Sequence, residues 1–76
     1  MKKITIQFDG QVDALVALAK RLAIYENRFN LSSEDFFDRF TKGHTEDSED
    51  YIEWANDYRH YLSIRTELMQ SLHHAA

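Results

Sequence analysis

Histidine and carboxylate side chains are the residues of this sequence best suited to chemistry. Asp57 and His60 stand three residues apart, so a helix would put both on one face, and His44 lies among acidic residues. Such groups bind metal ions or transfer protons. A metal site, however, needs further ligands, and an acid–base pair needs a pocket that shifts its pKa. A short chain leaves little room for such a pocket, so we expect no metal, no cofactor and no enzymatic activity.

Composition excludes other routes to covalent or nucleotide chemistry. The chain has no cysteine and only two glycines, Gly10 and Gly43. It therefore lacks a thiol nucleophile, a disulfide and a glycine-rich phosphate-binding loop. Ser32 and Ser48 stand where helix N-caps belong, and neither is flanked by glycine as a catalytic elbow serine would be. We therefore expect the carboxylates to act through their charge.

Negative charge is concentrated in the middle of the chain. Residues 34–57 hold nine acidic and two basic side chains, a formal charge of −7, whereas the whole chain carries −4. The stretch FTKGHTEDSEDYIEW, residues 40–54, runs from carboxylates directly into large rings. A surface of this kind repels phosphate backbones and attracts basic proteins. The alternative is an acidic face that only contacts solvent.

A helical wheel of the last segment separates its side chains into two neighbouring stripes. Carboxylates at 50, 53 and 57 form one stripe, aromatic rings at 54, 58 and 61 form the other, and Arg65 falls within the apolar face. Tyr, Trp and Arg are enriched at energetically dominant interface positions, so the pattern favours a binding surface over a purely structural aromatic core. The predicted partner-binding residues are Phe36, Phe40, Asp50, Tyr51, Glu53, Trp54, Asp57, Tyr58, Tyr61 and Arg65.

The elements that would position these residues form a single mostly α domain, residues 1–76, with a short N-terminal strand. Ile4, Ile6 and Phe8 alternate with polar residues, which predicts a strand over residues 1–9. Apolar spacing predicts helices over 10–30, 32–41 and 48–72, the last long and amphipathic. Because a lone strand is unstable and the apolar arc of the first helix is wide, we expect a homodimer or a hetero-oligomer with a partner.

No stretch is apolar enough to cross a membrane, and the N-terminus lacks a signal-peptide pattern. With no cysteines, the sequence gives no sign of an oxidising compartment. We therefore expect a cytoplasmic protein without membrane contact.

Residues 25–62, YENRFNLSSEDFFDRFTKGHTEDSEDYIEWANDYRHYL, resemble small prokaryotic antitoxins of toxin–antitoxin pairs. The matching positions are Ser32, Ser33, Phe36, Gly43, Asp50, Glu53 and Trp54, in order. The resemblance implies a protein that binds and neutralises a small RNase-like toxin. Joined to the acidic and aromatic stripes, it leads to the hypothesis that the last helix occludes the basic cleft of the toxin.

The start of the chain has a different resemblance. KKITIQFDGQVDALVALAKRL, residues 2–22, is similar to the start of ribbon-helix-helix proteins, in which paired strands of a dimer enter the DNA major groove. Lys3, Thr5 and Gln7 would then point outward and read operator DNA. The alternative function is accordingly a transcriptional regulator, in one version an autorepressor of the antitoxin's own operon.

Overall fold

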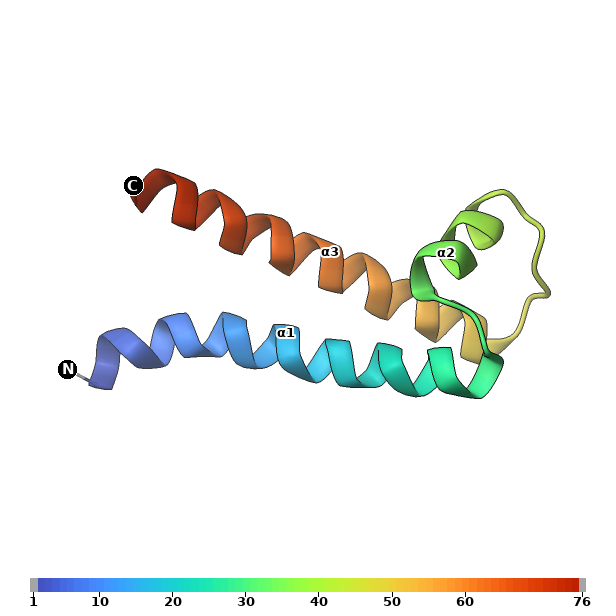
Figure 1. The fold of residues 1–76 in the computed structure, drawn as a ribbon, viewed down its shortest axis with the longest axis horizontal. Coiled ribbons are helices and arrows are strands. Elements are labelled where there is room, and N and C mark those ends of the chain that lie inside the picture. Colours follow the sequence, from blue (N-terminus) through green and yellow to red (C-terminus); the bar gives the residue numbers. More distant parts are fainter. Residues whose placement is uncertain (1, 76) are drawn as a thin grey trace.

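The computed structural model describes the backbone of residues 2–75 and the side chains of residues 10–72. The chain forms helices α1 (Lys2–Phe29), α2 (Ser33–Thr41) and α3 (Glu49–Ala75). Helices α1 and α3 run antiparallel, α2 packs at the end where they are joined, and both termini lie at the other end (Figure 1). The molecule is elongated, 47 × 21 × 17 Å.

The predicted mostly helical chain is confirmed, but the predicted strand over residues 1–9 is wrong. The backbone of residues 2–9 forms the first turns of α1, and residue 1 lies outside the described residues. A strand satisfies its N–H and C=O groups only by pairing with another strand. A helix satisfies them internally, and lengthening an existing helix avoids the cost of nucleation.

Serine side chains cap the starts of α2 and α3. Ser32 is the N-cap of α2, and its Oγ accepts a hydrogen bond of 3.1 Å from the backbone N–H of Asp35. Ser48 precedes α3, and its Oγ accepts one of 3.2 Å from the N–H of Tyr51. Each serine satisfies a backbone donor that the first helical turn leaves free.

Two residues in the left-handed region allow the chain to turn between the helices. Asn30, with φ of 54°, follows the end of α1, and asparagine tolerates this region better than most residues. Gly43, with φ of 75°, opens the loop of residues 42–48 between α2 and α3. The two turns bring α2 back against α1 and α3.

The core consists of two clusters along the α1–α3 contact. The cluster beside α2 contains Leu22, Phe36, Trp54 and Ala55, surrounded by partly buried aromatic rings. The second cluster, nearer the termini, contains Leu18, Ile64 and Leu68. Aromatic packing therefore stabilises the α2 end, and aliphatic packing of two helices alone stabilises the other.

Candidate partner-binding surface

The predicted acidic stripe of α3 lies against α1 of the same chain. Asp50 forms an ion pair with Arg28, Nη2 to Oδ2 3.1 Å, and Asp57 forms one with Arg21, Nε to Oδ2 3.0 Å. Between these pairs, the hydroxyl of Tyr25 donates a hydrogen bond of 3.4 Å to Glu53 Oε1. Every member of the stripe therefore has a partner within the chain.

The sequence contained a signal for this pairing. Arg21, Tyr25 and Arg28 follow one another by four and then three residues, and the stripe on α3 has the same spacing in reverse. Two antiparallel helices with matching reversed spacing place three pairs opposite one another in a single register. Considering α3 alone could not reveal this match.

The rings of the second predicted stripe are divided between the core and its edge. The side chain of Trp54 is 0% exposed and that of Phe36 is 1% exposed. Their rings stack with centroids 3.9 Å apart, and the Trp54 indole donates a hydrogen bond of 2.8 Å from Nε1 to Ser33 Oγ. These two predicted partner-binding residues thus lie inside the folded chain.

Four other predicted rings surround this core and keep part of their surface in solvent. They are Phe40, Tyr51, Tyr58 and Tyr61. The sequence interpretation missed two rings from α1: Tyr25 stacks on Trp54 with centroids 5.4 Å apart, and Phe29 does so at 5.5 Å. Both lie within the predicted first helix, but their direct contact with Trp54 depends on the fold.

Two tyrosines have altered acidity. Burial raises the pKa of Tyr25 above its ordinary value, and the negative charges of Asp57 and Glu53 raise it further, while Arg21 lowers it. Burial also raises the pKa of Tyr58, with a further increase from Glu34 and an opposing effect of Arg65. Both phenols are therefore protonated at neutral pH, and that of Tyr25 donates the hydrogen bond to Glu53.

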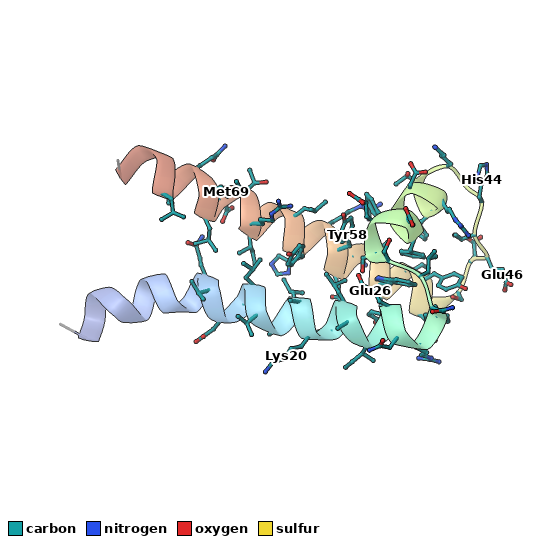
Figure 2. All side chains as sticks on the ribbon, in the orientation of Figure 1. Lys20, Glu26, His44, Glu46, Tyr58 and Met69 are labelled. Atoms are coloured by element: carbon teal, nitrogen blue, oxygen red, sulfur yellow. The ribbon has the colours of Figure 1, made fainter. Side chains whose placement is uncertain are left out.

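Three carboxylates at the joined end of the molecule differ from the stripe. Glu46 and Asp47 in the 42–48 loop and Glu49 in the first turn of α3 are exposed, and none forms an ion pair among the described residues. We call these three residues the acidic end. Figure 2 shows Glu46 and His44 projecting from the loop at this end, away from the long helices.

A pocket of about 300 Å³ lies next to the acidic end. The walls are formed by Phe29, Leu31, Phe36, Arg39, His44, Thr45, Glu46, Tyr51 and Trp54. Its volume is at the lower limit of ordinary ligand pockets and fits one bulky side chain of a partner. Rings thus line a hollow directly beside exposed negative charge.

The structure describes the side chain of Arg65 but not those of the three predicted DNA-reading residues. The Arg65 side chain is exposed and forms no ion pair among the described residues. Lys3, Thr5 and Gln7 lie in α1, and their side chains are outside those that the structure describes.

No group of three or more His, Cys, Asp or Glu residues in the described part of the chain is arranged to hold a metal ion. No helix, over those same residues, is long and apolar enough to cross a membrane. Comparisons with protein-family models, with curated proteins and with solved structures find no match to this chain.

Proposed function

We propose that this protein is a non-enzymatic antitoxin that neutralises a small RNase-like toxin by placing negative charge in the toxin's basic cleft. The observation that carries the proposal is the acidic end, Glu46, Asp47 and Glu49, exposed and without ion pairs among the described residues, beside a ring-lined pocket. A toxin that cleaves RNA needs a positively charged cleft, and complementary charge both steers the encounter and fixes its orientation. The resemblance of residues 25–62 to antitoxins supports the same function.

The internal pairing of the stripe changes which carboxylates make the first contact. Asp50 and Asp57 are held by Arg28 and Arg21 of α1, whereas the acidic end is free to meet basic side chains. Both members of the Arg28–Asp50 pair are exposed, and such pairs contribute only about 0–1 kcal/mol, so a toxin's Lys or Arg can replace Arg28 at small cost. The acidic end would therefore guide association, and the stripe would extend the contact.

The ring-lined pocket would supply the apolar part of the interface. A bulky side chain from the toxin would pack against Phe29 and Tyr51 at its walls, with Arg39 and His44 at the same pocket. Buried anchors in pockets dominate binding energy, while charges at the rim mainly affect the association rate. Operator binding, the alternative, requires a paired strand that the described backbone of residues 2–9 does not form, so no structural observation favours it.

The proposal is tested by co-expression with the product of the neighbouring open reading frame. That product should arrest growth when expressed alone, and the wild-type chain should restore growth. The double variant Glu46→Lys/Glu49→Lys should restore it poorly, because like charges slow association by about tenfold or more at low salt. The matched control Asp13→Lys/Glu67→Lys changes two exposed carboxylates elsewhere by the same charge and should protect as well as the wild type.

Two results would reject the proposal. A neighbouring product that does not arrest growth removes the toxin. Equal protection by the Glu46→Lys/Glu49→Lys variant and its control would show that the acidic end only contacts solvent. Far-UV circular dichroism of both variants establishes that each is folded, so that poor protection is assigned to binding.

A further inference from the structure

Helix α2 covers only one end of the face that α1 and α3 form together. One of its contacts on α1 is Glu26, whose Oε2 accepts a hydrogen bond of 2.9 Å from the backbone N–H of Ser33. Its contacts on α3 include Trp54, bonded to Ser33, and Tyr58, whose ring lies 5.1 Å from that of Phe37. Nine residues of helix span about 13 Å, whereas the 28 residues of α1 span about 42 Å. The same face therefore continues toward the termini without α2.

The part of this face that α2 leaves uncovered is mostly apolar. Counting in helical steps from Glu26 along α1 and from Tyr58 along α3 gives its residues: Val16, Ala19, Leu62, Arg65, Met69 and Leu72. We call these six residues the uncovered face. Val16, Met69 and Leu72 are 46%, 57% and 61% exposed. Figure 2 shows Met69 on α3 well beyond Tyr58, toward the end of the molecule that holds the termini.

The uncovered face has one charge, and a complementary pocket lies at its border with α2. Arg65 is exposed and forms no ion pair among the described residues. The pocket, of about 300 Å³, is lined by Ala19, Leu22, Glu26, Ser32, Ser33, Glu34, Tyr58 and Tyr61. Neither Glu26 nor Glu34 forms an ion pair in the described part of the chain. We call this hollow the Glu26/Glu34 pocket.

We propose that the protein forms a two-fold antiparallel dimer in which each uncovered face receives α2 of the other copy and each Arg65 enters the other copy's Glu26/Glu34 pocket. A two-fold interface brings the same two surfaces together twice, so an unpaired cation and an unpaired acidic pocket on one chain complete each other. The guanidinium meets two carboxylates and the rings of Tyr58 and Tyr61, which attract cations by their faces.

The spacing along α3 fixes the register of this dimer. Tyr58 and Arg65 are seven residues apart, two helical turns on one face. When α3 pairs antiparallel with its copy about a point between Tyr61 and Leu62, each Arg65 lies opposite a Tyr58. In that register α2 of one copy lies over Met69 and Leu72 of the other. The exposed carboxylates of α2 then approach a face that holds arginine and no acidic residue.

The first test measures mass in solution, with no toxin present, so its outcome is independent of the antitoxin proposal. Sedimentation of the wild-type chain should give twice the 9.0 kDa mass of the monomer. Met69→Glu should weaken the dimer at least tenfold in Kd, because it places a carboxylate in the apolar contact and within reach of Arg65 of its own chain, where it competes with the other copy's pocket. Ile24→Glu is the matched control: Ile24 is also apolar and 65% exposed, but lies outside the uncovered face, and its variant should remain dimeric.

The second test exchanges the charges that define the register. Arg65→Glu alone should be monomeric, because its new carboxylate faces Glu26 and Glu34 of the copy. Glu34→Arg alone should also dissociate, because its new guanidinium repels Arg65 of the copy and neutralises Glu26. A 1:1 mixture of the two variants should form a heterodimer. The carboxylate introduced by the first substitution then faces the guanidinium introduced by the second, and the unchanged Arg65 of one chain faces the unchanged Glu34 of the other. A misfolded variant could not regain assembly on mixing.

Three results would overturn the dimer. They are a monomeric wild-type chain at micromolar concentration, an Ile24→Glu variant as dissociated as Met69→Glu, or a mixture of charge variants that stays monomeric. A mixture that stays monomeric would exclude this register in two further cases: a wild type that is dimeric through another face, and an uncovered face that binds only other proteins.

Discussion

The hydrogen bond from the Trp54 indole to Ser33 joins α3 to α2 inside the core. Its length is 2.8 Å, and both residues are buried: Trp54 is 0% exposed and Ser33 is 3% exposed. Ser33→Ala removes the acceptor and leaves the indole N–H buried, where water cannot reach it. A buried donor without a partner costs about 1–3 kcal/mol, and we expect that loss in the free energy of unfolding.

That loss is large for a chain of 76 residues. Globular domains are stable by about 0.05–0.15 kcal/mol per residue, which gives about 4–11 kcal/mol here. Because Trp54 is the only tryptophan, its fluorescence reports directly on this part of the core during urea denaturation. Trp54→Phe removes the donor instead of the acceptor, and a double-mutant cycle with Ser33→Ala, followed by circular dichroism, isolates the coupling, expected to be about 1 kcal/mol.

Ser63→Ala is the matched control, because Ser63 is exposed on α3 and undergoes the same chemical change. It should alter the free energy of unfolding by no more than about 0.5 kcal/mol. If Ser33→Ala is as stable as Ser63→Ala, or if the coupling in the cycle is zero, the bond does not stabilise the packing of α2 and the reasoning is refuted.

Two further predictions concern an ion pair between α1 and α3 and the acidity of two tyrosines. The Arg21–Asp57 ion pair, in which Arg21 is exposed and Asp57 is largely covered, should contribute about 0.2–1 kcal/mol in a double-mutant cycle of alanine variants, and less at high salt. An unchanged coupling in about 1 M NaCl would contradict screening of this pair. Burial raises the pKa of Tyr25 and Tyr58 above 10.0, so the folded chain holds these two phenol protons more tightly than the unfolded chain does. Their contribution to the free energy of unfolding is therefore complete below pH 10.0 and is lost as the pH rises through the pKa values of the folded state. Urea denaturation at about pH 9 and about pH 11 should show this loss, and a Tyr58→Phe variant that loses as much stability as the wild type would disprove the contribution of Tyr58.

Local chemistry explains which parts of the fold were predictable. Ser32 and Ser48 are recognisable as caps because a serine before a helical pattern can satisfy the first free N–H groups, and both act in this way. The N-terminal strand was predicted from a short alternation of apolar and polar residues. That prediction did not consider that α1 could extend through the same residues. A short apolar pattern cannot choose between a strand that needs a partner and a helix that does not.

The candidate site was harder to predict because its environment depends on contacts between distant segments. Asp50 and Asp57 look like a free charged stripe on a wheel of α3, but the structure pairs both with α1. Trp54 has a side chain typical of interface anchors and of cores alike, and only the packing of α1 and α2 around it shows that it is buried. Residue type therefore indicated that the rings and carboxylates matter, while tertiary packing determines which of them can reach a partner.

The two proposals assign the negative charge of the middle segment to two separate surfaces. The acidic end comprises Glu46, Asp47 and Glu49, at the loop and the start of α3, whereas Glu34 lines the pocket on the side of α2 that borders the uncovered face. An antiparallel dimer places its two acidic ends at opposite ends of the assembly, so self-association leaves both available. It follows that Glu34→Arg should dissociate the dimer without abolishing toxin neutralisation, and Glu46→Lys/Glu49→Lys should weaken neutralisation without dissociating the dimer. Measuring both properties on both variants tests this separation, and if either variant loses both properties, the two surfaces are one.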